Sequence, residues 1–277
     1  MNSTLVVIIS VVVAVSSCIA ADANDGTQSS QGRTFALVVG GVIRDAEENL
    51  KKRASISVLE GFFSGPVKIE QQNIQVLTDT GSGRISDEGR STADNIKIAL
   101  EALAGAIKPE DRFVFYYIGQ ANVVGQHLRL NLSGEDITQD TLSKWLKPVR
   151  ASSILIVLDC PGAGLAAKAL AGKGRVIVCA CESEQHYSTQ LSDFFIPALQ
   201  DLKADSNSDS RVSMLEAFTW ASRQVDDWYR QKKLLTTETP VLEDDGDGVP
   251  SKRPWRYETS GTDGGIASGF FLIPKEW

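Results

Sequence analysis

Histidine and cysteine are scarce in this sequence. Its 277 residues include two histidines, His127 and His186, and four cysteines that form no C-x-x-C pair. Structural zinc sites usually take their ligands from such pairs, so we expect no bound metal and no cofactor. Any chemistry that needs an imidazole base would depend on one of these two histidines.

Clusters of basic residues are also missing. The formal net charge is −7, and no basic patch stands out along the chain. Proteins that bind nucleic acid usually carry a concentrated positive surface, so we expect no nucleic-acid partner. Hydrophobic residues make up 42% and charged residues 23% of the chain, which is typical of a globular domain with a sizeable core.

The first 33 residues differ in composition from the rest. Residues 5–15, LVVIISVVVAV, form an uncharged apolar run that is too short to span a bilayer comfortably, and small residues follow it. This pattern predicts a signal peptide over residues 1–21, a flexible leader over residues 22–33, and export to the periplasm or the medium. The alternative is a lipoprotein anchored to the membrane at Cys18, because VSSC resembles a loose bacterial lipobox.

Strand-like apolar runs alternate with helical patterns from residue 34 onward. The runs cover residues 34–41, 73–79, 112–119, 153–159, 175–181 and 269–274. Segments such as residues 91–107 have the apolar spacing of helices. This alternation favours a parallel sheet that is covered on both faces. We predict one α/β domain over residues 34–277, a three-layer α/β/α sandwich with a mainly parallel sheet of about six strands.

The stretch ILIVLDCPGAG, residues 154–164, ends a buried strand in a glycine-rich turn. Gly162, Gly164 and Ala167 fit the pattern G-x-G-x-x-A, and Glu182 lies where a dinucleotide-binding fold places an acid for the ribose. One alternative is therefore a dinucleotide-binding oxidoreductase. Asp159 opposes this alternative, because it would place a negative charge beside the pyrophosphate.

Several short motifs together carry a resemblance to a known family. They are, in chain order, RTFALVVGG, LTD, STADNIKIALEAL, KPEDRFVFYYIGQ, ILIVLD and TETPVLEDDGDG. Their order and spacing resemble the caspase/legumain-like cysteine peptidases, particularly the divergent bacterial caspase-like proteins. The resemblance covers most of the chain after the leader and implies a caspase-like fold. It also implies that a histidine follows one central strand and assists a cysteine that follows the next.

The sequence departs from this family at both catalytic positions. Gln120, in YYIGQAN, stands where the resemblance places the histidine, and Pro161 stands where it places the cysteine. Glutamine has no usable proton affinity near neutral pH, and proline offers neither a nucleophile nor an N–H group. The resemblance therefore implies a catalytically degenerate homologue that binds a peptide or protein partner or regulates one. The matching cleft loops contain Gly119, Ala121, Asp159, Gly162 and Gly164.

An active cysteine peptidase with a displaced pair of catalytic groups is a second alternative. Cys160 would be its nucleophile, and His127 or His186 its base. One step along a strand end turns a side chain to the opposite face, which opposes this alternative. The strand order of the family would instead bring Cys160 close to Cys179 or Cys181. Only the one nearer the strand end, Cys181, should reach Cys160, and a disulfide bond between these two could form after export.

The acidic run EDDGDG, residues 243–248, resembles the beginning of a calcium loop. The acid that closes such a loop would fall at Pro254, which cannot bind a cation. We therefore expect a solvated turn at this run.

Overall fold

The computed structural model describes residues 32–79, 87–256 and 262–275. The predicted signal peptide, most of the predicted leader, and Cys18 lie outside these residues, so export and lipidation stay predictions. Among the described helices, none is long and apolar enough to cross a bilayer.

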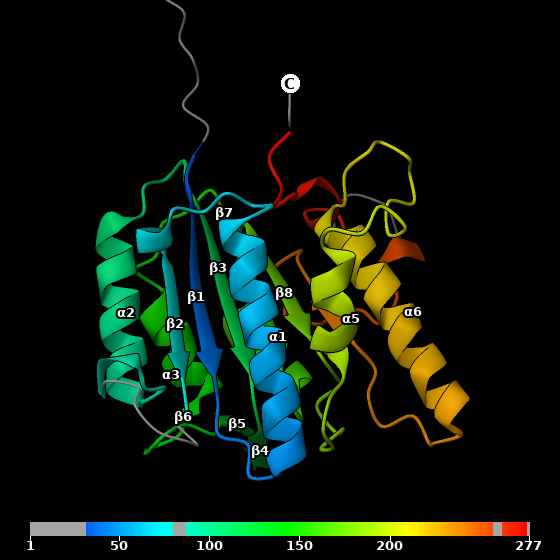
Figure 1. The fold of residues 1–277 in the computed structure, drawn as a ribbon, viewed down its shortest axis with the longest axis horizontal. Helices are drawn as coiled ribbons and strands as arrows, with labels where there is room; N and C mark the ends of the chain where they lie inside the picture. Colours follow the sequence, from blue (N-terminus) through cyan, green and yellow to red (C-terminus); the bar gives the residue numbers. More distant parts are fainter. Residues whose placement is uncertain (1–31, 80–86, 257–261, 276–277) are drawn as a thin grey trace, which may run out of the picture. The chain divides into compact units, whose positions relative to one another are not determined.

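A six-stranded sheet forms the centre of the fold, with the strands in the order β2-β1-β3-β7-β8-β9 (Figure 1). The strands are β1 (Thr34–Gly40), β2 (Ile74–Thr78), β3 (Arg112–Ile118), β7 (Ser153–Asp159), β8 (Arg175–Cys179) and β9 (Val241–Glu243). All neighbours in this sheet pair in parallel except β8 and β9, which are antiparallel. The predicted mainly parallel sheet of six strands is confirmed.

Helices cover both faces of this sheet. One face carries α1 (Ala46–Ser64), α5 (Leu191–Ala198) and α6 (Met214–Lys232), which lie in front of the sheet in Figure 1. The other face carries α2 (Ala93–Ala106), α3 (Gln139–Leu146), α4 (Ala167–Leu170) and a small sheet of β4 (Ala121–Val124), β5 (His127–Leu130) and β6 (Ile137–Thr138). The predicted three-layer α/β/α sandwich is therefore confirmed.

Alternate residues of each central strand enter the two cores. Val114 and Tyr116 of β3 belong to the core beneath α1, α5 and α6, whereas Phe113 and Phe115 belong to the core on the other face. Successive side chains of a strand point to opposite faces, so both sets must be apolar when both faces are covered. This explains why the central strands read as continuous apolar runs.

The start of α1 determines which of its side chains reach the sheet. Asp45 caps this helix, and its carboxylate accepts a hydrogen bond from the amide of Glu48 at 2.8 Å. From this start, Lys52, Ile56 and Leu59 fall on the buried side of the helix. The cap thereby places one lysine inside the protein, facing the sheet.

The sixth strand of the sheet is not the one that the sequence predicts. The apolar run at residues 269–274 forms no strand, and β9 pairs with β8 instead. Phe270 and Leu272 of the run are buried in the core beneath α1, α5 and α6, so packing alone explains their apolar character. The three-residue strand β9 is too short to produce a periodic pattern.

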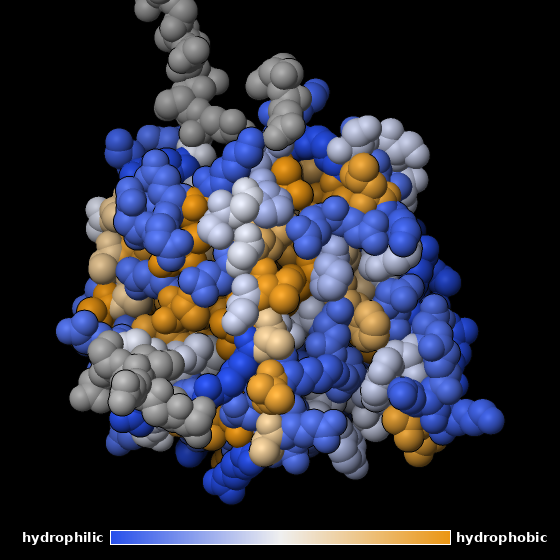
Figure 2. Space-filling view, in the orientation of Figure 1, coloured by the Kyte–Doolittle hydropathy of each residue, from blue (hydrophilic) through white to orange (hydrophobic). Residues whose placement is uncertain are grey.

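Figure 2 shows the face of the molecule that carries α1, α5 and α6. Its surface is mainly hydrophilic around α6, whereas hydrophobic surface gathers between α1 and α2, over the edge strand β2. Leu50 and Val58 of α1 and Ile98 of α2 are among the exposed large apolar residues. The outer edge of β2, where the described residues provide only a bridge between Thr78 and Arg90, borders this hydrophobic surface.

Candidate functional site

The carboxyl ends of β3 and β7 lie side by side at one edge of the sheet. Ile118 pairs with Asp159 at the ends of the two strands, and the amide of Gly119 donates to the carbonyl oxygen of Asp159 at 3.1 Å. Gln120 and Pro161 each follow two residues after this last pair. The adjacency of the two strands is therefore confirmed, and the two positions that the resemblance assigns to catalysis lie at the same edge, where parallel α/β sheets hold their sites.

The loop that carries Gln120 is fixed by its backbone. The carbonyl oxygen of Gln120 accepts hydrogen bonds from the Tyr117 hydroxyl at 2.7 Å and from the amide of Asn131 at 3.0 Å. A Cβ atom at Gly119 would lie 2.8 Å from Cα of Gly41, so the close approach of these two loops requires glycine. The loop then continues directly into β4 at Ala121.

The turn after β7 uses its backbone amides internally. Pro161 is buried, and Gly162 has a positive φ of 66°. The amide of Gly162 donates to the carbonyl oxygen of Gln185 at 2.8 Å, and that of Gly164 donates to Cys181 at 2.9 Å. These two amides are therefore not available to a phosphate or an oxyanion.

The dinucleotide-binding alternative loses support from the same turn. The helix that follows, α4, has only four residues and begins at Ala167, so it provides little of the helix dipole that holds a pyrophosphate. Glu182, the candidate acid for the ribose, instead forms an ion pair with Lys252 at 2.8 Å.

Cys160 is wholly buried and faces the layer of α2, α3 and α4, whereas Asp159 turns toward α1. Burial, with additional repulsion from Cys181 and Cys179, raises the pKa of the Cys160 thiol well above its ordinary value. The thiolate is the reactive form of cysteine, and this environment suppresses it. The geometry therefore opposes Cys160 as a nucleophile.

The two histidines are exposed and have partners of their own. Nδ1 of His127 lies 3.1 Å from a carboxylate oxygen of Asp140, and Nε2 of His186 lies 2.9 Å from the carbonyl oxygen of Ser183. His186 is close to the turn after β7, because a Cβ atom at Gly162 would lie 3.6 Å from its ring. An exposed imidazole with such a partner does not activate a thiol enclosed in the core.

The expected disulfide bond is not formed in the structure, where Cys160, Cys179 and Cys181 are free thiols. The Cys181 sulfur instead donates to the carbonyl oxygens of Cys160 at 3.4 Å and Gln185 at 3.3 Å. Burial raises the pKa of Cys181 to about 12. The sulfur therefore holds two loop backbones together as a hydrogen-bond donor.

A buried ion pair lies beneath this edge of the sheet. The carboxylate of Asp159 accepts hydrogen bonds from Nζ of Lys52 at 2.7 Å, from the Thr189 hydroxyl, and from the amide of Ser192 at 3.2 Å. Burial by itself would raise the pKa of Asp159, but the charge of Lys52 and these hydrogen bonds hold it below its usual value. Asp159 is therefore ionised, and its charge is compensated from within the protein.

Glu238 lies close to this pair and is almost completely buried. Its Oε2 accepts a hydrogen bond from the amide of Gln190 at 2.7 Å, whereas its Oε1 has no partner among the described residues. Burial, and then the charge of Asp159, raise the pKa of Glu238 to about 8. This carboxyl group is therefore mostly protonated at neutral pH, and its proton can be donated.

Neither Lys52 nor Glu238 stands out in the sequence. Lys52 lies 107 residues from Asp159 along the chain, so no local pattern connects them. Glu238 belongs to the motif TETPVLEDDGDG, but one glutamate among polar residues gives no sign of burial. The one sequence signal for Lys52 is its place within the apolar stripe of a helix, which indicates burial. This signal can be read only when the first residue of the helix is known.

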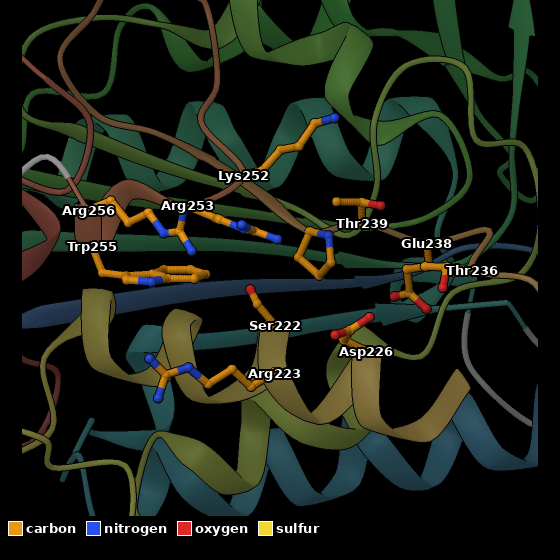
Figure 3. Close-up of a pocket in the computed structure, with 11 residues that line it drawn as sticks. Ser222, Arg223, Asp226, Thr236, Glu238, Thr239, Lys252, Arg253, Trp255 and Arg256 are labelled. Carbon is orange, nitrogen blue, oxygen red and sulfur yellow. The ribbon is translucent and has the colours of Figure 1, made fainter. Parts of the chain in front are cut away.

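A pocket of about 410 Å³ opens beside Glu238. Figure 3 shows side chains of α6 on one wall, the segment from Lys252 to Arg256 on the other, and Glu238 with Thr236 and Thr239 at one end. Since β9 begins where β8 ends, this pocket lies at the same edge of the sheet as Gln120 and Pro161. Its volume is in the range of pockets that bind small molecules or single side chains.

Positive charge predominates in this pocket. Its lining contains Arg223, Arg253 and Arg256, together with Lys252, which is paired with Glu182 at 2.8 Å. Its acids are Asp226, which is paired with Arg230 at 3.3 Å, and the mostly protonated Glu238. The guanidinium of Arg223 lies 5.8 Å from the ring centre of Trp255, which adds an aromatic surface. A basic pocket in a chain of net charge −7 is suited to an anionic ligand.

One group of carboxylates in the described part of the chain has the spacing of metal ligands. It consists of Glu243, Asp245 and Asp263, each of which offers an oxygen within 4.8 Å of the others. Because β9 runs antiparallel to β8, Glu243 lies toward the opposite edge of the sheet from Pro161. This group is therefore separate from the basic pocket.

Comparison with known proteins gives a similarity of fold alone. No protein-family model matches the chain, and no curated protein sequence matches it. Among solved structures, the chain is similar to the crystal structure of caspase-1 from Spodoptera frugiperda, at 8% sequence identity and a TM-score of 0.49. The alignment covers 77% of this chain and 87% of that chain.

Proposed function

We propose that this chain is a caspase-like protein without peptidase chemistry that binds an acidic peptide segment at the carboxyl edge of its sheet. The observation that carries the proposal is that the residues at this edge lack the groups that peptide hydrolysis needs. Gln120 and Pro161 offer neither base nor nucleophile, and the adjacent thiol of Cys160 is enclosed in the core with a raised pKa. The order of the sequence motifs, and the adjacency of β3 and β7, support the caspase-like assignment.

The basic pocket supports an acidic peptide as the ligand. Arg253 and Arg256 lie on one wall and present planar guanidinium groups, which pair well with carboxylates. Glu238 closes one end of the pocket and is mostly protonated, so it adds little negative charge that would repel an acidic ligand.

The catalytic half of the proposal is tested by hydrolysis. Purified protein is expected to leave peptides with Asp, Asn, Arg or Lys before the scissile bond uncleaved. Any activity is traced to its source by comparing Cys160→Ala with Cys179→Ala. The second variant controls for the loss of a buried thiol. Hydrolysis that disappears only in Cys160→Ala would overturn the proposal.

The binding half is tested with two fluorescent peptides of equal length, one rich in aspartate and one in which lysine replaces each aspartate. Anisotropy should show saturable binding of the acidic peptide alone, weakened by added salt. Arg253→Gln combined with Arg256→Gln should weaken binding at least about tenfold, since each charged hydrogen bond contributes roughly 1.5–3 kcal/mol. Arg129→Gln removes an exposed arginine on β5 and should leave the affinity unchanged. Equal binding of both peptides would contradict an acidic ligand.

We also propose that the protein acts after export, because of the apolar run at residues 5–15. Amino-terminal sequencing of the protein recovered from the medium or periplasm is expected to begin near residue 22. Recovery of the intact amino terminus from the cytoplasm would contradict export. Recovery of a lipidated Cys18 in the membrane fraction would favour the lipoprotein alternative.

A further inference from the structure

Three carboxylates from two separate segments meet beyond the end of β9. Glu243 ends the strand, Asp245 lies in the turn that follows, and Asp263 belongs to the carboxyl-terminal segment. Each offers one oxygen within 4.8 Å of the others. Like charges at this separation repel one another, so such an arrangement needs compensation.

Glu243 is the buried centre of this group, with none of its surface exposed. Its Oε1 accepts hydrogen bonds from the amides of Gly246 at 2.7 Å and Gly248 at 3.2 Å. Its Oε2 is also buried and has no hydrogen-bond partner among the described residues. An unpartnered buried carboxylate oxygen is costly, and a cation is the partner that would remove this cost.

No basic side chain fills that role. Within residues 32–79, 87–256 and 262–275, none of the three carboxylates forms an ion pair. Arg175 is near enough to interact electrostatically with Glu243, but its Nη1 donates to the carbonyl oxygen of Leu170 at 2.7 Å. The negative charge of the group is therefore left for a ligand from solution.

We propose that Glu243, Asp245 and Asp263 bind a divalent cation of the calcium type. The ligands are all hard oxygens, which favour Ca²⁺ or Mg²⁺ over transition metals, and a turn that supplies several oxygens suits the larger ion. A contiguous calcium loop is excluded here, because its closing acid would fall at Pro254. The fold instead provides the additional acid from Asp263.

A second acidic segment in the chain could bind the same ion and must be distinguished. Residues 205–216, DSNSDSRVSMLE, have the spacing of a calcium loop, with Glu216 at the twelfth position. Both oxygens of Glu216 have partners, since Oε1 accepts from the amide of Ser206 at 3.0 Å and Oε2 from that of Ser213 at 2.9 Å. No buried acidic oxygen of residues 205–216 lacks a partner, so we assign the cation to the group at Glu243.

Calorimetric titration and thermal unfolding of the chelator-treated protein test the assignment. Ca²⁺ is expected to bind and to raise the unfolding midpoint by several degrees at about a hundredfold excess over its dissociation constant, and Mg²⁺ less. Asp245→Asn, at an exposed position, should weaken Ca²⁺ binding at least about tenfold while the protein stays folded. Glu243→Gln keeps the acceptor for the two glycine amides and should have the same effect.

Control variants make the outcome decisive. Glu135→Gln removes one exposed negative charge elsewhere and should leave Ca²⁺ binding unchanged. Two bound ions in the original protein, reduced to one by Asp245→Asn, would also support the site. Absence of Ca²⁺ binding would overturn the proposal. So would binding that survives Asp245→Asn and Glu243→Gln but is lost in Asp205→Asn.

Discussion

The pair formed by Lys52 and Asp159 is enclosed by three elements of the fold. The side chains are 4% and 0% exposed, and Nζ of Lys52 also donates to the carbonyl oxygen of Thr189 at 2.7 Å. Such a pair adds little stability relative to well-packed apolar residues, but removing one partner leaves a buried charge without compensation. The pair therefore fixes α1 and β7, and the loop before α5, in one arrangement.

Replacement of Lys52 by methionine is expected to lower the free energy of unfolding by about 3–5 kcal/mol, because Asp159 keeps a buried charge with no counterion. Lys51→Met is the matched control. Lys51 is exposed and paired with Asp193 at 2.5 Å, so its loss should cost less than about 1 kcal/mol. Urea unfolding of both variants provides the measurement, and equal losses would contradict the structural role of the buried pair.

Glu238 makes stability depend on pH in an unusual direction. Its pKa is about 8 in the folded protein and near the ordinary 4.5 in the unfolded chain. Between these pH values the folded state binds one more proton, so the free energy of unfolding falls as pH rises, by up to about 1.4 kcal/mol per pH unit. Below pH 4.5 Glu238 is protonated in both the folded and the unfolded state, so it no longer lowers the free energy of unfolding.

Glu238→Gln should therefore stabilise the protein relative to the original chain, with a gain that grows from pH 5 to pH 8. Glutamine keeps the size of the side chain and carries no charge at any of these pH values. Urea unfolding at pH 5, 6, 7 and 8 measures the difference. Glu135→Gln, at an exposed position, should show a difference that is constant across this range, and the same flat result for Glu238→Gln would contradict the raised pKa.

At the residue scale, the candidate site positions could be predicted from the sequence, whereas the side chains that contact them in the fold could not. Gln120 and Pro161 could be placed from adjacent motifs, because the ends of neighbouring parallel strands share one edge. Lys52 and Glu238 could not be found, since their roles depend on contacts between segments far apart in the chain. The structure holds Cys160 and Cys181 as free thiols, with the Cys181 sulfur directed to backbone carbonyl oxygens, and the disulfide bond after export stays a prediction.

At the element scale, the turn after β7 depends on a glycine for two reasons. Gly162 has a φ of 66°, which disfavours any residue with a Cβ atom. A Cβ atom there would also lie 2.6 Å from Cγ2 of Val123 in β4. The turn is thus closely covered by the small sheet. This contact explains how β4 closes over the site that the family resemblance identifies.

Gly162→Ala should consequently destabilise the protein by about 1–3 kcal/mol more than a glycine replacement elsewhere that causes strain at a positive φ but no steric clash. Gly125→Ala is that control, since Gly125 has a similar φ of 62° and nothing within 4 Å of an added Cβ atom. Thermal or urea unfolding of the two variants measures the difference. Similar destabilisation by both would show that β4 does not press on the turn.

The elements that the sequence predicted well are those with a long buried pattern. The runs at β1, β3 and β7 were recognisable because strands covered on both faces are apolar throughout. The run at residues 269–274 is equally apolar, but its Phe270 and Leu272 are buried without strand pairing. Burial and pairing therefore produce the same local signal, and only tertiary structure separates them.

At the scale of the whole molecule, loops from distant parts of the chain are tied together at the carboxyl edge. Gln185 connects the loop after β8 to the segment before β9, because its Oε1 accepts from the amide of Thr239 at 2.8 Å. The ion pair of Glu182 with Lys252 joins the same loop to the wall of the basic pocket. These contacts close the edge around Pro161 and leave the basic pocket open beside it.

This closure predicts that placing histidine and cysteine at the two positions identified by the resemblance will not produce peptidase activity. In Gln120→His combined with Pro161→Cys, the new thiol would replace a buried proline, and burial raises the pKa of a thiol. The nearby amide of Gly162 would still donate to Gln185 rather than to an oxyanion. We therefore expect no peptide hydrolysis above that of Gln120→His alone. Alkylation by iodoacetamide should be much slower than in Val124→Cys, where the replaced side chain is 51% exposed. Hydrolysis by the double variant would show instead that the edge can open, and that only these two residues separate the protein from a peptidase.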